Sequence, residues 1–554
     1  MSARYFAPVF QRLYVWGEAE LDALMEDILS EDAVAPQFLG AIVLKDLGKL
    51  KGPTSPMSYL IIDGQQRLTT IFLLFAAIAE AAASASHEDI STYIQNEYLT
   101  ESRSPAFAGQ PKLVPTLQDR ASLWSVLEST FPKINWDFKV DPTDGRSAAK
   151  LEGQWLRIQK KLSEIFYDAK GKFMKDRLEF FLEHLQNQLN LIVITLDEHD
   201  DANLIFSKLN ASGIPLSLTD LVRNEVFSKF DSSDSRKADK FYDTRWHPFE
   251  RSFLKISDLN AFFPIYSYIA FSGSITKAGA FLGLQKKWSK STPQKILSDL
   301  EDYAPSFRAL ISGGDSPSFG KELNGMVNRF SRMPRTTVTW PYIIQLLHSV
   351  SNVSQEKNAV KCLEIVESFL VRRAIAGVEP TGLHVVFKGL WQHAGADPEK
   401  VKSKIITRTI KVPSSEELNK IIQEEPLDTR VILPYVLSEF ERDLRRKNRY
   451  DSITNTIATV EHVMPKKRGV EWKVGVAKDY DAIVGLIGNL IPLSETQNKS
   501  AKDEAWALKR KRFAGSNFFL AQRLAKTKKW DSSEIKAKTV EISAWVQKRW
   551  PLAQ

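Results

Sequence analysis

The sequence predicts an α+β protein that is predominantly helical. Three short apolar runs rich in β-branched residues, at residues 37–45, 59–63 and 189–196, are typical of buried strands. Apolar residues at helical spacing dominate elsewhere, and residues 240–445 contain few strand patterns. The length of 554 residues is enough for roughly two to four domains of ordinary size.

Composition and charge exclude several classes of protein. The only cysteine, Cys362, excludes an internal disulfide and a zinc site built on cysteines, and it fits a reducing cytoplasm. No uncharged apolar run reaches about 18 residues, and the first residues lack a signal-peptide core, so we expect a cytoplasmic protein without a membrane partner. The formal charge of +8 favours polyanions mildly. Residues 502–549 contain thirteen Lys and Arg against five Asp and Glu, which indicates either a nucleic-acid surface or a solvated helix face.

The first elements alternate between helix and strand. A helical segment follows the stretch Phe10 to Gly17, and its apolar face consists of Leu21, Leu24, Met25, Ile28 and Leu29. Residues 37–45 predict a buried strand, and a loop rich in proline, glycine and serine leads to the next strand. This second strand ends at Asp63 and runs into an alanine-rich helix at residues 71–85.

The stretch after the second strand combines groups that suit a phosphate. Gly64 permits a tight turn after Asp63, and the helix then opens over Gln65, Gln66, Arg67, Thr69 and Thr70. A helix N-terminus offers free N–H groups and a positive dipole, to which Arg67 adds a bidentate donor. Asp63 could hold a metal or orient a water. The alternative is that Asp63 and Thr69 only cap the helix and Arg67 forms a surface pair.

Several motifs together resemble a known nucleotide-binding module. The residues are Gln11-Arg12 before Tyr14-Val15-Trp16, then residues 38–42, then Asp63-Gly64-Gln65-Gln66-Arg67. They are similar to the DUF262 domain, a ParB-like module that forms the sensor half of GmrSD-type, modification-dependent (type IV) restriction enzymes. No GxxxxGK[ST] motif occurs, so the nucleotide chemistry would not be that of a P-loop.

This resemblance implies that the module binds and hydrolyses an NTP, with GTP, UTP and ATP all open. The residues it assigns to the cofactor are Arg12, Asp63, Gly64, Gln65, Gln66, Arg67, Thr69, Thr70 and Asn210, with Asp63 also catalytic. Asn210 is included because residues 206–221 resemble the same domain. By their chemistry alone, Asn210 and Asp220 equally suit helix caps. Relatives act on phosphorothioate or glucosylated hydroxymethylcytosine DNA. Since sulfur is poorly hydrated, an apolar pocket formed by Tyr14, Val15 and Trp16 would suit a phosphorothioate.

The middle of the chain carries less chemistry. Residues 131–150 predict a loop, residues 151–186 a helical segment and residues 189–196 a strand. The acidic cluster at residues 197–201 includes His199 and is either a metal site or a solvated turn. We assign no chemistry to residues 240–445, because their histidines are isolated and no internal repeat occurs.

The C-terminal region holds a set of residues that suits phosphodiester cleavage. A run of β-branched residues at 457–463 contains Glu461-His462, and Asn489 and Asn498 follow on either side of a turn. A histidine with a pKa near 6.5 can deprotonate a water at neutral pH. One divalent ion can stabilise both the phosphorane and the leaving oxygen, and oxygen ligands favour Mg²⁺ or Mn²⁺. The alternative is that Glu461-His462 is an ordinary strand end.

The pattern also resembles DUF1524, an HNH (ββα-metal) nuclease family that forms the effector half of the same enzymes. The matching residues are Glu461-His462, Pro465, Gly488-Asn489-Leu490, Leu493, Asn498, Lys509 and Phe513. The resemblance implies His462 as general base, Glu461 and Asn498 as metal ligands, and Asn489 as the residue that orients the histidine loop. It suggests that Lys509 contacts the DNA backbone. Asn498 stands where many HNH enzymes have histidine, so metal affinity would be modest.

We therefore expect three parts. Residues 1–235 would be a ParB-like α/β domain that binds NTP and senses DNA, residues 236–445 a helical connection, and residues 446–554 an HNH nuclease domain. The expected activity is modification-dependent cleavage of double-stranded DNA in anti-phage defence, with NTP turnover as the switch. A homodimer or higher oligomer is open. The alternatives are a nucleotide-gated DNA-binding regulator, and a nuclease that acts on unmodified phage DNA or RNA.

Overall fold

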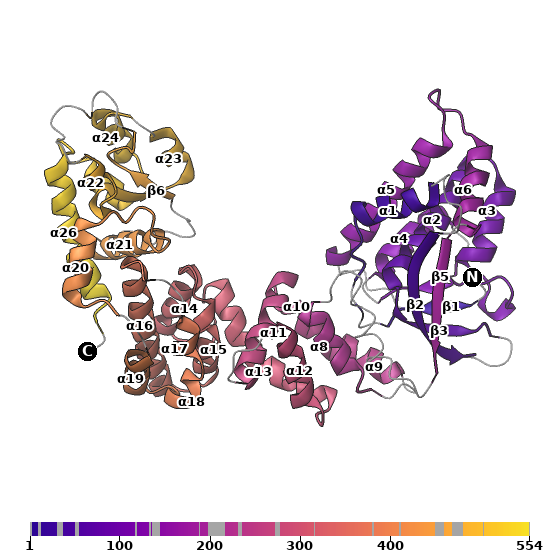
Figure 1. Ribbon diagram of the computed structural model, residues 1–554, viewed down its shortest axis with the longest axis horizontal. Helices are drawn as coiled ribbons and strands as arrows, with labels where there is room; N and C mark the ends of the chain where they lie inside the picture. Colours follow the sequence, from indigo (N-terminus) through magenta and orange to yellow (C-terminus); the bar gives the residue numbers. More distant parts are fainter. Residues whose placement is uncertain are drawn as a thin grey trace. The chain divides into compact units, whose positions relative to one another are not determined.

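A computed structural model places most of the chain in two compact units (Figure 1). It describes residues 3–8, 11, 13–29, 37–49, 55–116, 119–131, 134–135, 145–187, 189–197, 217–230, 235–271, 277–314, 316–378, 382–408, 412–448, 459–467, 472, 480–501 and 504–552. The first unit comprises Met1–Leu254 with Gln285–Leu297, and the second comprises Lys255–Leu284 with Ser298–Gln554.

The first unit contains a mixed sheet of five strands in the order β4-β1-β3-β2-β5. The strands are β1 (Arg4–Phe6), β2 (Gln37–Gly48), β3 (Ser58–Asp63), β4 (Leu113–Val114) and β5 (Leu189–Leu196). The pair β2–β3 is antiparallel, whereas β1 pairs in parallel with β3 and β4, and β2 with β5. The three predicted strands are confirmed. The other two were missed because runs of two or three residues carry no period to detect.

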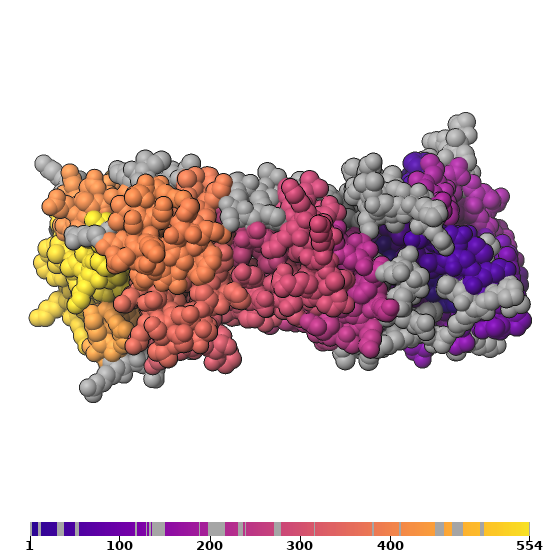
Figure 2. Space-filling model, turned by 90° about the horizontal axis from the view of Figure 1, so that it is seen from below, coloured from indigo at the N-terminus to yellow at the C-terminus, as the bar shows by residue number. Residues whose placement is uncertain are grey.

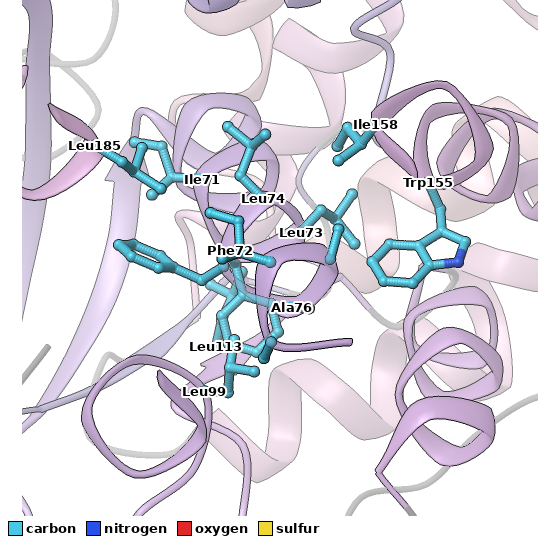
Figure 3. Packing of buried hydrophobic residues seen from close by; sticks show 14 of the residues in the cluster. Ile71, Phe72, Leu73, Leu74, Ala76, Leu99, Leu113, Trp155, Ile158 and Leu185 are labelled. Atoms are coloured by element: carbon cyan, nitrogen blue, oxygen red, sulfur yellow. The ribbon is translucent and has the colours of Figure 1, made fainter. Parts of the chain in front are cut away.

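The long helix α2 (Gln65–Ser84) forms the centre of the first unit. Its residues Ile71 to Ala76 meet side chains from several surrounding elements, as Figure 3 shows for Leu99, Leu113, Trp155, Ile158 and Leu185. By length and apolar composition alone, α2 passes the test for a membrane span, but 72% of that stretch is buried inside the fold. Its burial makes α2 a core helix in this structure.

The other described helices of the first unit either pack in the core around α2 or come after β5 in the chain. They are α1 (Glu18–Leu29), α3 (Glu88–Ile94), α4 (Arg120–Thr130), α5 (Gly145–Phe166), α6 (Lys175–Asn187), α8 (Leu218–Phe227), α9 (Ser235–Phe241) and α10 (His247–Arg251). Asp220 forms a capping box with Ser217 at the start of α8, which agrees with its interpretation as a helix cap. Arg223 binds the buried Glu250 at 2.5 Å and thereby joins α8 to α10.

In the residues that the structure describes, the second unit is helical except for two strands. Its described helices are α11 (Ile256–Phe271), α12 (Lys277–Trp288), α13 (Pro293–Ser312), α14 (Lys321–Arg332), α15 (Trp340–His348), α16 (Val353–Ile375), α17 (Leu383–Phe387), α18 (Leu390–Ala394), α19 (Pro398–Arg408), α20 (Ser415–Glu424), α21 (Leu433–Lys447), α22 (Tyr480–Val484), α23 (Glu495–Ala501), α24 (Trp506–Ala514), α25 (Phe519–Leu524) and α26 (Ser532–Arg549). One end each of α12 and α13 is assigned to the first unit. The strands β6 (Thr459–His462) and β7 (Leu490–Leu493) pair with each other. The predicted fold class, α+β and predominantly helical, is confirmed.

Helices that precede the two strands belong to the same packed body. Helix α21 packs on β7, and α20 packs on α26 near the C-terminus. Figure 2 shows the yellow atoms of the C-terminal segment beside orange atoms of preceding segments. The predicted boundary at residue 446 falls inside this packed body. Helix α20 and nearly all of α21 come before the boundary, and the elements on which they pack come after it.

A buried lysine in α26 makes stability depend on pH. Lys538 is 7% exposed, and its Nζ has no hydrogen-bond partner among the described residues. Burial lowers the pKa of the Lys538 ammonium to about 7; Glu541 and Glu441 oppose this and Arg523 adds to it. The unfolded chain keeps the ordinary pKa near 10.4, so it binds more protons above pH 7. Stability therefore rises with pH between about 7 and about 10.4.

We expect Lys538→Met to remove this dependence. The variant should be more stable than the wild type by a few kcal/mol at pH 7. The difference should shrink by pH 9, because the cost of deprotonating the lysine on folding falls as the pH approaches the unfolded-state pKa. Chemical denaturation at pH 7, 8 and 9 measures the effect. The exposed Lys536 of the same helix supplies the control, Lys536→Met, which should change stability little at any pH. Equal pH profiles for wild type and Lys538→Met would contradict the expectation.

Candidate functional site

The turn between β3 and α2 leaves the start of α2 without a side-chain cap. Gly64 is the N-cap residue and has no side chain, and among the described residues no side chain caps the first N–H groups. Its φ of 91° lies in the left-handed region, which glycine adopts at little cost. Neither Asp63 nor Thr69 caps the helix, so the capping alternative for these two residues is excluded. The free N–H groups of the first turn remain available to an anion.

Two buried polar atoms near this helix start have no partner in the described part of the chain. They are Nε2 of Gln65, whose side chain is 5% exposed, and Oγ1 of Thr69, which is 1% exposed. Leaving such a group unpaired costs about 1–3 kcal/mol, so native folds rarely keep one without a ligand, water or ion. The pair fits the oxygen-rich phosphate that was predicted here.

Arg67 adds a positive charge to the same turn. Its Nη1 donates to the carbonyl of Ala41 at 3.0 Å, which directs the guanidinium toward β2. Burial lowers the pKa of Arg67, and the charge of Asp63 opposes this effect. A partly buried guanidinium with most of its N–H groups not bound to Ala41 suits phosphate recognition. Because Arg67 is partly buried and bound to a backbone carbonyl, it does more than form a surface pair.

The structure brings residues 13–15 onto α2. Gln66 accepts from the N–H of Val15 at 2.7 Å and donates to the carbonyl of Leu13 at 3.1 Å. The hydroxyl groups of Thr70 and Tyr14 lie 2.6 Å apart. The side chains of Gln66 and Thr70 therefore hold this segment, and their predicted contacts with a nucleotide would compete with these bonds.

The residues predicted to sense DNA modification face largely inward. Tyr14 is 2% exposed, and burial raises the pKa of its hydroxyl. Trp16 packs against the hydrophobic core, and Val15 is half-buried. Because Tyr14 offers almost no surface, direct contact between its ring and DNA requires movement of the segment. Arg12 and Asn210, and most of the acidic cluster with His199, lie outside the described residues.

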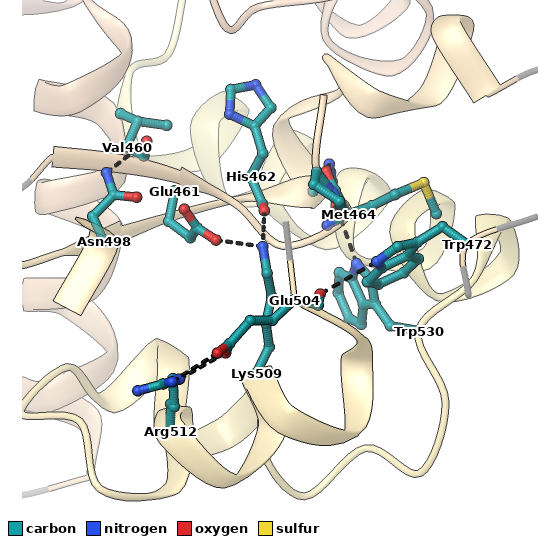
Figure 4. Close-up of polar contacts among 12 residues, drawn as sticks. Val460, Glu461, His462, Met464, Trp472, Asn498, Glu504, Lys509, Arg512 and Trp530 are labelled. Atoms are coloured by element: carbon teal, nitrogen blue, oxygen red, sulfur yellow. Dashed lines mark hydrogen bonds and ion pairs between the residues drawn. The ribbon is translucent and has the colours of Figure 1, made fainter. Parts of the chain in front are cut away.

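The second candidate site is built on β6, β7 and the helix α23 that follows them. The strands are antiparallel, with Glu461 opposite Ile491 and His462 opposite Leu490. The predicted strand at 457–463 is confirmed for Thr459–His462. Successive side chains of a strand point to opposite faces, so Glu461 and His462 project in different directions. Figure 4 shows the imidazole of His462 directed away from the Glu461 carboxylate.

Asn489 fixes the loop that leaves β6. It is fully buried, and its Oδ1 accepts from the N–H of Met464 at 2.7 Å and from the indole N–H of Trp530 at 3.1 Å. Its Nδ2 donates to the carbonyls of Met464 and Val484, at 2.9 and 2.8 Å. These four bonds agree with the predicted role of orienting the histidine loop. They also leave Asn489 without surface for a substrate, so its burial is compatible with a positioning role and not with substrate contact.

His462 pairs with an aspartate far away in sequence. Its Nε2 lies 3.3 Å from Oδ2 of Asp428, and Lys466 Nζ lies 2.6 Å from the same oxygen. Burial lowers the pKa of the imidazole, as does the charge of Lys466, while Asp428 partly opposes them. Burial also disfavours ionisation of Asp428, but Lys466 and His462 outweigh it and lower the pKa of its carboxyl. A neutral imidazole beside an ionised carboxylate is the form that accepts a proton.

Sequence reasoning missed Asp428. It lies in a short turn between α20 and α21, 34 positions before His462. In sequence, an aspartate in a turn between two helices gives no sign of a catalytic role. Only the packing of α21 against the strands brings it to the imidazole.

Glu461 forms a buried ion pair with Lys509. The distance from Lys509 Nζ to Oε1 of Glu461 is 2.6 Å, and the same ammonium donates to the carbonyl of His462 at 2.8 Å (Figure 4). The side chain of Lys509 is 0% exposed. This burial argues against the predicted contact of Lys509 with a DNA phosphate, because the ammonium has no surface. The exposed ammonium beside His462 belongs instead to Lys466.

The predicted metal ligands, Glu461 and Asn498, partly fit a hard divalent cation. Asn498 uses its amide nitrogen to bind Thr459 and Val460, at 2.9 and 3.3 Å, which leaves its side-chain oxygen for another partner. Oε1 of Glu461 is bound to Lys509, so a cation at this carboxylate would compete with the ion pair. The described residues contain no group of three or more His, Cys, Asp or Glu side chains that could hold a metal. One carboxylate and one amide oxygen suit Mg²⁺, which keeps several waters and binds substrate phosphates.

Two family models match the chain. Residues 1–227 match the model of the GmrSD restriction endonuclease N-terminal domain, and residues 413–545 match that of the GmrSD restriction endonuclease C-terminal domain. The second match includes Asp428 and both helices that precede the strands. No curated protein matches the chain.

Proposed function

As the chain has the architecture of a GmrSD-type restriction endonuclease, we propose that it cleaves modified DNA in anti-phage defence. His462 is the general base of the reaction, and an NTP bound at the start of α2 controls it. The pair of His462 and Asp428 carries this proposal, because a half-buried imidazole held by a carboxylate is a ready general base. In this proposal, the part of the chain that contains β6, β7 and α23 is an HNH nuclease. The modification is a phosphorothioate or a glucosylated hydroxymethylcytosine.

His462 acts on the attacking water. The neutral imidazole takes a proton from the water as the water oxygen bonds to phosphorus, and Asp428 stabilises the imidazolium that results. The bond from phosphorus to the leaving sugar oxygen breaks, and that oxygen takes a proton from solvent. Lys466 lies on the exposed side of this pair, where its ammonium can attract a DNA phosphate. Mg²⁺ or Mn²⁺, held by Glu461 and Asn498, would neutralise charge on the phosphate. Asn489 keeps the loop after His462 in one conformation.

Nucleotide binding at α2 supplies the control. The free N–H groups of the first turn, Gln65, Arg67 and Thr69 hold phosphate oxygens, and Asp63 orients a water or a metal for hydrolysis. An NTP can shift the enzyme between sensing and cutting states only by binding one of them more tightly.

Cleavage of a panel of DNAs tests the proposed function. Plain, phosphorothioate-modified and glucosylated hydroxymethylcytosine duplexes are incubated with the full chain and Mg²⁺ or Mn²⁺, with and without GTP, UTP or ATP. We expect cleavage of one modified DNA, with a rate that changes when the matching NTP is added. Binding without cleavage of any DNA would favour the alternative of a nucleotide-gated DNA-binding regulator. Equal cleavage of plain and modified DNA would favour a nuclease without modification specificity.

Substitution of Thr69 separates ligand binding from folding. Thr69→Val removes a hydroxyl that has no described partner, so we expect unchanged or slightly raised thermal stability. Loss of a hydrogen bond to a charged phosphate should weaken NTP binding about tenfold. Fluorescent-nucleotide titration and thermal unfolding measure the two effects.

The neighbouring Thr70 supplies the matched control. Its hydroxyl binds Tyr14 and the carbonyl of Gln66 at 2.9 Å, so Thr70→Val should lower stability by about 1 kcal/mol. An unchanged nucleotide affinity in Thr69→Val would remove this hydroxyl from the phosphate site.

A further inference from the structure

A cavity in the second unit combines three arginines. Its volume is about 260 Å³, and it lies between the turn after α14, the end of α16 and the turn that precedes α21. Arg335, Arg373 and Arg430 line it, together with Thr429 and apolar side chains. The lining residues that the structure describes include no carboxylate. Three guanidinium groups around one cavity that no described carboxylate lines favour an anionic occupant.

Arg430 is held at this cavity by tight packing. A Cβ added at Gly377 would clash with Nη1 of Arg430, so the guanidinium rests directly on the glycine backbone. Gly377 has a φ of 67°, where a side chain would also be strained. The Nε of Arg430 is buried and has no hydrogen-bond partner among the described residues. Its contact with Glu425 is long, at 3.4 Å, and both side chains are partly exposed.

The other two arginines give independent support. Arg373 is 7% exposed, and burial lowers the pKa of its guanidinium, so its charge lies in surroundings that solvate it poorly. An anion in the cavity would offset that cost. Arg335 has a φ of 58°, and a non-glycine residue in this region is strained. Strain of this kind is found preferentially at ligand sites.

We infer that this cavity binds a phosphate group. The volume exceeds that of a phosphate, so the group can be part of a larger molecule, and its source is either a phosphate of the DNA backbone or a free phosphate compound. Arginine is the side chain best suited to phosphate, because its N–H groups match the oxygens in pairs.

The cavity adjoins the turn that carries Asp428. Thr429 and Arg430 follow it directly, and the N–H of Arg430 donates to the carbonyl of Leu427 at 3.0 Å, which closes the turn around Asp428. Leu427 is in turn bound to the carbonyl of Gly485 at 2.8 Å. A phosphate held by Arg430 would therefore fix the turn that positions the partner of His462. This last step rests on the proposed nuclease function, but the binding of phosphate does not.

Hydrogen–deuterium exchange of the full chain in EDTA tests the binding site, because it reports locally and needs no cleavage. Inorganic phosphate, compared with chloride at equal ionic strength, should slow exchange across residues 427–432. The half-maximal phosphate concentration should rise about tenfold in Arg430→Gln, since a charge-assisted hydrogen bond is lost. Gly377→Ala should do the same without a change in net charge, because it displaces the guanidinium. Arg446→Gln, at the exposed end of α21, should behave as the wild type.

A second arm identifies the source of the phosphate. Protection by a DNA duplex that is weakened in Arg430→Gln and displaced by free phosphate would assign the site to the DNA backbone. Protection by phosphate alone, with unchanged DNA affinity in Arg430→Gln, would assign it to a free phosphate compound. No phosphate-specific protection of residues 427–432 in the wild type, or equal protection in Arg430→Gln, would overturn the inference.

Discussion

Replacing His462 with alanine is expected to slow DNA cleavage about 100- to 10,000-fold, which is the usual contribution of a positioned general base. DNA affinity should stay close to that of the wild type, since the imidazole acts on water rather than on the backbone. Single-turnover cleavage of the preferred modified DNA measures the rate, and binding in EDTA measures the affinity. A wild-type rate in His462→Ala would remove this residue from the chemistry.

Two companion variants locate the effect. Asp428→Asn retains the shape of the partner but not its charge, so it should lose less activity than His462→Ala. His393→Ala removes an exposed histidine elsewhere in the same unit and should cleave normally. If Asp428→Asn were fully active, the contact of 3.3 Å with His462 would have no catalytic role.

The second large effect concerns the buried pair of Lys509 and Glu461. Lys509→Met leaves a carboxylate that is 5% exposed without its counter-charge, and such changes typically cost about 3–5 kcal/mol. We expect a loss of that size in the unfolding of the C-terminal unit, followed by denaturant titration and tryptophan fluorescence.

The double variant Glu461→Gln/Lys509→Met provides the internal check. Because it removes both charges, it should recover most of the lost stability, although not the activity if Glu461 holds a metal. Lys400→Met breaks an exposed pair with Asp397 and should change stability by less than about 1 kcal/mol. A small effect of Lys509→Met, comparable with that of Lys400→Met, would contradict the role given to the buried pair.

The strands and the central helix were predictable because their patterns are local. Residues 58–63 and 65–84 show a short apolar run, a glycine and a long apolar helix in direct succession, and each step has its own signal in sequence. The two-residue strand β4 has no such signal, and its place beside β1 is a product of tertiary packing.

The candidate nuclease site was predictable only in part. The motif locates His462 and Asn489, but the alternation of β6 turns Glu461 toward Lys509 and leaves His462 to face Asp428. The opposite directions of Glu461 and His462 follow from the two-residue period of a strand. The contact of His462 with Asp428 does not, because Asp428 reaches the site through the packing of helices. Likewise, nothing local distinguishes the buried Lys509 from the exposed Lys466.

Chemical rescue with free imidazole tests whether His462 is the general base. His462→Gly leaves a space for free imidazole beside Asp428, so added imidazole should restore part of the single-turnover cleavage rate in a saturable, pH-dependent manner. His393→Gly, prepared in parallel, should show no response to imidazole. If cleavage by His462→Gly were as fast as that of the wild type without imidazole, the base would lie elsewhere and the account of this site would be wrong.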